Sequence, residues 1–115
     1  MAKIQKRVHG PATVSNAAAT KYTVPANCKA KRLRVHVQNP SGLAIALTVS
    51  IGADAAGVRL LDAYSIPAAA AGVTGNVIDF YWDHVLEETE IIQAFTGGAG
   101  GILVMTISVD EETLG

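Results

Sequence analysis

Few residues of this chain have the chemistry that catalysis requires, and their spacing does not bring them together. Histidine occurs at His9, His36 and His84, and Cys28 is the single cysteine. A cysteine nucleophile needs a base beside it and a third group that orients the base. No histidine or carboxylate lies near Cys28 in the sequence. We therefore expect Cys28 to be an unreactive thiol, buried or half-buried, and His36 to lie on the polar face of a strand.

One local group of side chains has the composition of a metal site, namely Asp79, Asp83, His84 and Glu87. In a strand, Asp79 and Asp83 would point to one face and His84 to the other, so these ligands do not converge on one ion. The sequence therefore predicts no metal site here.

Two further patterns resemble catalytic motifs, but neither has the features that the motif requires. The glycine-rich stretch at 97–101 would need Lys and Ser or Thr after it to be a phosphate-binding loop, but Ile102 and Leu103 follow. The acidic runs at 87–90 and 110–112 could supply a pair of catalytic carboxylates, yet runs of this kind are typical of solvated turns and termini. We expect no enzymatic activity, no catalytic residue and no cofactor.

The elements that would position these residues are strands, because apolar and polar residues alternate with a period of two through most of the chain. The clearest case is 33–38, followed by Asn-Pro-Ser-Gly at 39–42, which fits a type I turn, and by a second alternating run at 43–51. We expect these two runs to form a β-hairpin. Further strands are expected at 3–8, 20–24, 58–66, 77–82, 90–95 and 103–109.

About eight short strands at this spacing predict an all-β protein, a single antiparallel β-sandwich or jelly-roll-like domain. A chain of 115 residues is long enough for one domain with its own core. We expect residues 1–14 to form a basic N-terminal arm or first strand and residues 15–115 to form the sandwich. The apolar runs are too short to cross a membrane and no secretory leader is evident, so we expect synthesis in a reducing cytoplasm.

Charge is divided sharply along the chain. Residues 1–53 carry eight basic residues and no acid, a net charge of +8, whereas residues 54–115 carry ten acids and Arg59, a net charge of −9. The two halves could form separate surfaces that contact other copies of the chain. Alternatively, basic and acidic strands are neighbours in one sheet and neutralise each other.

If separate surfaces form, the basic half supplies a positive docking patch and the acidic half its counterpart on a neighbouring copy. The basic residues expected in this interface are Lys3, Lys6, Arg7, Lys29, Lys31, Arg32 and Arg34. The acidic residues are Glu87, Glu88, Glu90, Asp110, Glu111 and Glu112. Nucleic acid is not an expected partner, because the acidic half would repel it and the basic half has only Tyr22 for base stacking.

The order of several short motifs resembles that of a known family. KYTVPAN (21–27) precedes a strand and the turn at 39–42, YSIPA occurs at 64–68, and VLEETEII (85–92) precedes a glycine-rich turn and a last segment ending in VDE (109–111). This order, over roughly residues 15–112, resembles small all-β structural proteins of tailed bacteriophage virions. Their Gly-Asp before the penultimate strand is replaced here by Glu88-Thr89-Glu90, and residues 1–10 have no counterpart.

The resemblance implies a virion structural protein without catalytic residues, a class that includes capsid decoration (cement) proteins, head fibres and minor tail components. We expect a decoration protein that stabilises the phage head lattice on the outer capsid surface. Its partners would be the major capsid protein and further copies of itself, in a homotrimer or another closed ring. Two alternatives stay open, a minor tail or fibre component and a carbohydrate-binding sandwich for host adhesion, for which Tyr64 and Tyr81 are the available aromatic residues.

Overall fold

The computed structural model describes residues 3–52, 59–69, 76–98 and 100–114, and these residues form eight strands and no helix. The all-β prediction is confirmed. In chain order the strands are β1 (Lys3–Thr13), β2 (Ala19–Thr23), β3 (Cys28–Asn39), β4 (Ile45–Ile51), β5 (Arg59–Ile66), β6 (Asn76–Trp82), β7 (Ile91–Gly97) and β8 (Val104–Thr113). Val58 of the strand expected at 58–66 and Ala99 of the glycine-rich stretch lie outside the described residues.

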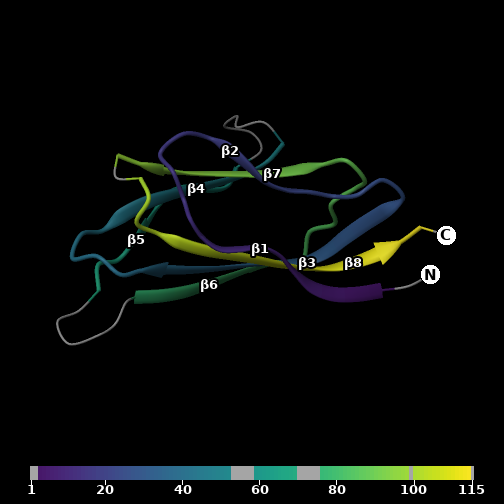
Figure 1. Cartoon of the computed structure of the whole chain (residues 1–115), viewed down its shortest axis with the longest axis horizontal. Helices are drawn as coiled ribbons and strands as arrows, with labels where there is room; N and C mark the ends of the chain where they lie inside the picture. The colour runs from purple at the N-terminus through teal and green to yellow at the C-terminus, as the bar shows by residue number, and fades with distance from the viewer. Residues whose placement is uncertain (1–2, 53–58, 70–75, 99, 115) are drawn as a thin grey trace.

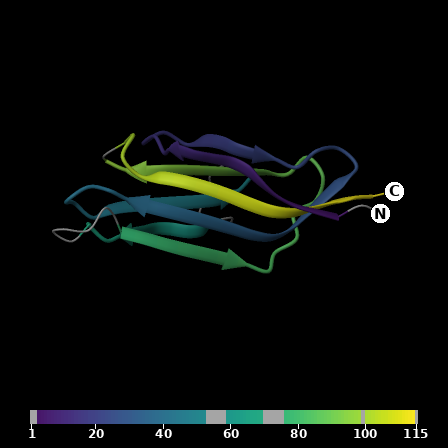
Figure 2. The same ribbon diagram turned by 60° about the horizontal axis from the view of Figure 1, so that its bottom comes forward.

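The strands form two antiparallel four-stranded sheets that pack face to face (Figure 1). We call β1-β8-β3-β6 sheet A and β2-β7-β4-β5 sheet B. β1 pairs with β8, β2 with β7, β3 with β6 and β4 with β5, so the chain is one long hairpin rolled into two layers, which is the jelly-roll topology. The second view shows the strands of each sheet side by side (Figure 2).

The hairpin predicted for 33–38 and 43–51 is wrong. β3 lies in sheet A and β4 in sheet B, so the turn at 39–42 carries the chain from one sheet to the other. Asn39 holds this crossing in place, because its fully buried amide donates to the carbonyl oxygens of Leu43, Ile66 and Pro67 at 2.9, 3.1 and 3.1 Å. Its Oδ1 accepts from the Ser41 N–H at 3.0 Å. A period of two fits both a hairpin and two strands facing each other across a core, so the pattern alone does not separate them.

The core lies between the sheets and consists of aliphatic side chains from the central strands. Sheet A contributes Leu33, Val35 and Val37 from β3 and Met105, Ile107 and Val109 from β8, each at most 1% exposed. Sheet B contributes mainly from β4 and β7. Burial of this apolar surface is the main force that holds the two sheets together.

A β-bulge in β3 keeps the apolar side chains on the inner face of sheet A where strict alternation would turn them outwards. Ala30 and Leu33 are both buried although they are three residues apart. The pairing of β3 with β8 shifts between Lys31 and Arg34, and Arg32 adopts a positive φ of 54°. A bulge of this kind inserts one residue and returns the following side chains to the correct face. As a result Lys31, Arg32 and Arg34 all lie on the outer face of sheet A.

Candidate assembly surfaces

The outer face of sheet A carries most of the charged residues that the sequence singles out, and they alternate in sign across the strands. The acidic strand β8 lies between the basic strands β1 and β3, so that Asp110 is opposite Lys31 and Glu112 is opposite Lys29. Arg32 Nη1 lies 3.0 Å from Asp110 Oδ2, and Lys31 Nζ lies 3.2 Å from Glu112 Oε2. Cross-strand pairs of opposite charge stabilise a sheet modestly.

A row of four residues crosses this face from the edge strand β1 to the edge strand β6, and none of the four is acidic. Arg7 of β1 is opposite Ser108 of β8, Ser108 is opposite Arg34 of β3, and Arg34 is opposite Tyr81 of β6. Arg7 and Arg34 are exposed, and neither has an ion-pair partner among the described residues. The row borders a hollow of about 390 Å³ whose lining includes Gln5, Arg32, Arg34, Tyr81, Ser108 and Asp110.

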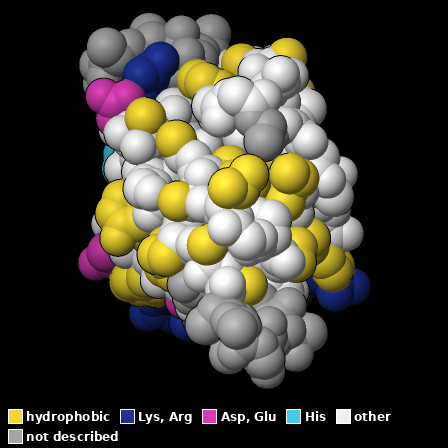
Figure 3. Space-filling view, turned by 90° about the vertical axis from the view of Figure 1, so that its left-hand side faces the viewer, with side chains coloured by type: hydrophobic (Ala, Val, Ile, Leu, Met, Phe, Trp, Pro, Cys, Tyr) yellow, Lys and Arg dark blue, Asp and Glu magenta, His cyan; other side chains and the backbone are white. Residues whose placement is uncertain are grey.

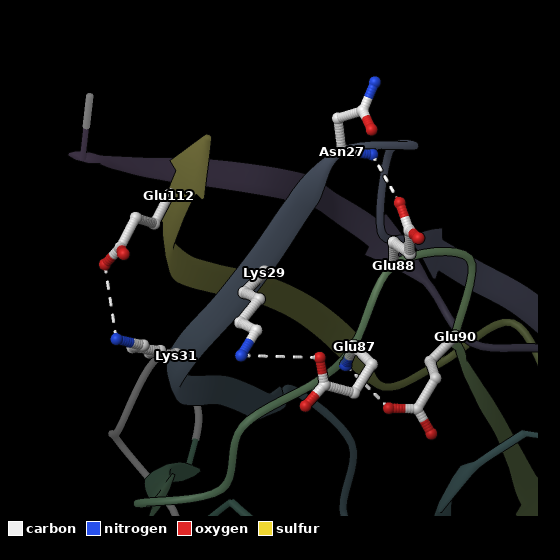
Figure 4. Close-up of polar contacts among 7 residues, drawn as sticks. All are labelled: Asn27, Lys29, Lys31, Glu87, Glu88, Glu90 and Glu112. Atoms are coloured by element: carbon white, nitrogen blue, oxygen red, sulfur yellow. Dashed lines mark hydrogen bonds and ion pairs between the residues drawn. The ribbon is translucent and has the colours of Figure 1, made fainter. Parts of the chain in front are cut away.

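The carboxylates of the acidic turn before β7 make hydrogen bonds and an ion pair within the chain (Figure 4). Glu90 Oε1 accepts the Glu87 N–H at 2.7 Å, and Glu88 Oε2 accepts the Asn27 N–H at 2.6 Å. Glu87 Oε2 lies 3.7 Å from Lys29 Nζ. The carboxylates therefore satisfy backbone donors of the 86–90 turn and of the chain entering β3, which explains their presence without an external partner.

On the β1/β2 side, a polar triad joins the two sheets. The Tyr22 hydroxyl of sheet B donates to Glu111 Oε2 at 2.6 Å, and Lys6 Nζ lies 2.8 Å from Glu111 Oε1 in sheet A. Burial raises the pKa of Glu111, but the hydrogen bonds from Lys6 and Tyr22 outweigh it and hold the pKa below its ordinary value. Burial and the same hydrogen bond raise the pKa of the Tyr22 phenol. The triad is therefore a charge-assisted clamp between the sheets at neutral pH.

On the β5/β6 side, aromatic rings form the contact between the two sheets. Tyr64 of sheet B meets Phe80 of sheet A edge to face, with ring centroids 5.3 Å apart. Phe80 stacks on Trp82, two residues further along β6, with ring centroids 5.9 Å apart. Contacts of this geometry contribute beyond the area they bury.

The four edge strands differ in regularity. β1 has two register shifts, and a Cβ on its Gly10 would collide with the Met105 carbonyl oxygen, so a glycine is needed there. β2 has one shift in five residues, and β5 has two shifts and a positive φ at Ala63. β6 pairs with β3 through seven consecutive residues without a shift. Natural sheets commonly distort their edges to prevent pairing with another chain, so β6 is the least protected edge.

The end of the sandwich that contains the β3–β4 crossing is largely uncharged (Figure 3). In this view hydrophobic side chains are spread over the face, and charged ones lie towards its margins. Leu43, at 70% exposed, is the most exposed of the large hydrophobic residues described.

The predicted site residues fall into groups that the sequence could not distinguish. Lys6, Lys31 and Arg32 have carboxylate partners on the neighbouring strand β8, as the neighbouring-strand alternative anticipates, and Lys29 pairs with Glu87 of the turn before β7. Among the residues that the structure describes, Arg7 and Arg34 have no such partner. Lys3 lies in β1 opposite Glu112, and its side chain is outside the description. An interface between copies through these residues stays a prediction.

Residues with potential chemistry are dispersed. His9 lies in β1, Cys28 begins β3 and is half-buried, and His84 follows β6. His36 Nδ1 lies 2.7 Å from Asp79 Oδ1 on the polar face of sheet A, as predicted for His36. Within the described part of the chain, no group of three or more His, Cys, Asp and Glu residues could hold a metal ion.

Sequence reasoning missed two features of these surfaces. The first is the Tyr22–Glu111 contact, because the partners are 89 residues apart in the chain. The second is the exposed edge of β6, because edge position depends on strand order. Both features depend on the order of the strands in the two sheets, which no local pattern encodes.

Comparison with known proteins gives the fold and little more. No family model and no curated protein matches this chain. One solved structure, described as "Bacillus endospore appendages form a novel family of disulfide-linked pili", aligns over 98% of this chain and 89% of its own, with a TM-score of 0.52 and 12% identity. At this identity the likeness shows a shared sandwich fold. No helix that could cross a membrane occurs in the described ranges.

Proposed function

We propose that this chain is a non-enzymatic structural subunit that assembles with copies of itself on the surface of a virion. The observation that carries self-assembly is the regular edge of β6, which is flanked by Val77 at 47% and Tyr81 at 53% exposed. An unprotected edge strand with apolar side chains beside it pairs readily with a second strand. The similar solved structure is that of an appendage described as a pilus, which is compatible with this role.

Two geometries of self-association follow from this edge. Pairing of β6 with β6 of a second copy is isologous and closes as a dimer. If the pairing is centred on Phe80, Asp79 lies opposite Tyr81 of the second copy, and the repulsion between two copies of Asp79 is avoided. The homotrimer or other closed ring expected from the charge division requires β6 to meet a different surface instead.

Light scattering of the purified chain at low and high salt tests self-assembly. We expect a discrete oligomer, and we expect Val77→Lys to be a monomer because the added charge lies beside the pairing edge. Thr13→Lys is a matched control: Thr13, Val104, Gln38 and Val77 form one row across sheet A, and Thr13 is at its opposite end. A monomeric native chain at both salt concentrations would exclude self-assembly.

The location that we propose is the outer surface of a bacteriophage head, as a capsid decoration protein bound to the major capsid protein. The support is the order of motifs from KYTVPAN to the final VDE segment. A compact subunit that bridges lattice junctions adds a small interface many times over. Mass spectrometry of purified virions that contain this chain would decide the location. A copy number near that of the major capsid protein supports decoration, whereas a few copies per particle indicate the minor tail or fibre alternative.

Carbohydrate binding is the second candidate, because Tyr81 borders the hollow together with Gln5 and Asp110. An exposed aromatic ring next to polar side chains is the usual arrangement for sugar recognition. A glycan array probed with the native chain and with Tyr81→Ala tests this function. Absence of binding by the native chain would remove it.

A further inference from the structure

We infer that the hollow on the outer face of sheet A is a binding site for a single carboxylate, supplied by an acidic side chain of a partner protein that docks on this face. The site consists of the row Arg7–Ser108–Arg34–Tyr81 and the residues that line the hollow beside it. This inference is independent of self-association through the β6 edge.

The cations on this face differ in whether they have an acidic partner. Arg32 is bound to Asp110 at 3.0 Å and Lys31 to Glu112 at 3.2 Å. Arg7 and Arg34, on either side of Ser108, have no acidic partner among the described residues. Two guanidinium groups on one sheet face that no described carboxylate neutralises produce a local positive potential, and this potential attracts an anion.

Arg34 lines the hollow together with Ser108, Tyr81 and Gln5, whose side chains carry hydroxyl or amide donors. A guanidinium offers two parallel N–H donors that match the two oxygens of a carboxylate, and hydroxyl and amide donors can complete its coordination. All of these groups project from paired strands, so the site is held by the sheet itself.

The acidic residues near the hollow limit the charge of the ligand that it can bind. Asp110 also lines the hollow, with its charge balanced by Arg32, and Glu112 lies further along the same strand. A single negative charge is favoured by Arg7 and Arg34, whereas a polyanion such as nucleic acid would also meet the acids of β8. The arrangement therefore favours an isolated carboxylate over a phosphate chain.

The bulge in β3 determines where Arg32 and Arg34 lie on the sheet. Arg32 takes a positive φ of 54°, a conformation that costs energy in a non-glycine residue. The bulge turns Arg32 onto Asp110 and, in the same step, returns Arg34 to the outer face. Asp110 is thereby neutralised next to Arg34, which leaves Arg34 available to an external anion.

An NMR titration of the ¹⁵N-labelled full chain tests the site. The probe is a terminally blocked Gly-Glu-Gly peptide, which carries one carboxylate, with Gly-Gln-Gly as the uncharged control peptide. We expect the amide signals of Ser108, Arg34 and Tyr81 to shift with Gly-Glu-Gly and not with Gly-Gln-Gly, and we expect added salt to weaken binding. A lack of shifts in this row would overturn the proposal.

Two variants separate a specific site from general charge attraction. Arg34→Gln should weaken binding of the acidic peptide about fivefold or more. The affinity of Arg34→Lys should lie between those of the native chain and Arg34→Gln, because lysine keeps the charge but loses the paired donors. Lys21→Gln removes the same charge from β2 in sheet B and should have no effect. Equal weakening by Arg34→Gln and Lys21→Gln would exclude a defined site.

Titration with inorganic phosphate and with a thymidine octanucleotide completes the test. We expect either to bind more weakly than Gly-Glu-Gly. Tighter binding of phosphate or of the oligonucleotide at this row would contradict the carboxylate assignment. The unchanged amide spectrum of each variant away from the row verifies that it is folded.

Discussion

On the β1/β2 side, sheets A and B are joined by the triad of Lys6, Glu111 and Tyr22, whereas on the β5/β6 side they are joined by the rings of Tyr64, Phe80 and Trp82. Both sides have to hold two edge strands against each other. The triad depends on ionisation and the ring cluster on apolar burial, so the two sides should respond differently to pH, salt and truncation.

The same two sides differ in how they meet other molecules. β1 and β2 are both interrupted by register shifts, so that side is closed to further strands. On the other side β5 is interrupted but β6 is regular, and Val77 and Tyr81 are exposed beside it. The comparison indicates that the polar side serves the stability of the single chain and that the aromatic side also leaves an edge available for a partner.

The largest effect on this comparison is expected from Phe80→Ala, which removes the ring between Tyr64 and Trp82. Because Phe80 is half-buried, the free energy of unfolding should fall by about 2–3 kcal/mol, below the range for a fully buried ring. Urea denaturation measures this change. Tyr64→Phe is the control, since it keeps the ring contact and should change stability by less than about 0.5 kcal/mol. A loss below 1 kcal/mol for Phe80→Ala would mean that the rings do not join the sheets.

A smaller effect is expected from Glu111→Gln, which keeps the shape of the side chain and removes its charge. The hydrogen bonds from Tyr22 and Lys6 then become weaker, and the free energy of unfolding at neutral pH should fall by about 1–2 kcal/mol. Tyr22→Phe should lose a similar amount. In a double-mutant cycle the two losses should not add, because both changes break the same contact; additive losses would show that Tyr22 and Glu111 act separately.

The difference between the native chain and Glu111→Gln should also depend on pH. The pKa of Glu111 is lowered in the fold, so its contribution is complete above the pKa of about 4.3 of an unfolded glutamate and is lost as the pH falls through the folded value. The pKa of Tyr22 is raised, so its contribution is complete below about pH 10 and is lost as the pH rises further. Denaturation curves from acid to alkaline pH measure both limbs. A difference that stays constant in acid would contradict the ionised triad.

The smallest effect is expected from Lys29→Gln, which breaks the ion pair with Glu87 at the end of sheet A. Glu87 is 59% and Lys29 37% exposed in their side chains, so the free energy of unfolding should change by less than about 0.5 kcal/mol. Thermal denaturation at low and high salt measures it. A larger, salt-sensitive loss would indicate that the charged face contributes to stability, rather than being available mainly for binding.

The strands were predictable from the sequence to within a few residues, except at the end of β1, the start of β3 and the end of β8. β1 continues to Thr13 because Gly10 permits a close approach to Met105 that a period-two pattern cannot indicate. The bulge at Arg32 was equally hidden, although Ala30 and Leu33 at a spacing of three contain the signal. The hairpin error has another cause. The turn at 39–42 has residues that suit a hairpin, but the buried amide of Asn39 connects it to β5 of the other sheet.

What the sequence determined by itself is the class of structure: alternating Val, Ile and Leu in eight short runs can bury their apolar faces only as strands of a sandwich, and no local cluster of residues supports catalysis. Only the tertiary structure decided which strands are neighbours, and therefore which charges are paired. β8 lies between β1 and β3, so Lys6, Lys31 and Arg32 meet its carboxylates, whereas Arg7 and Arg34 have no acidic partner in the described part of the chain. The physical reason is that alternation specifies the face of a side chain, whereas strand order depends on contacts between segments far apart in the chain.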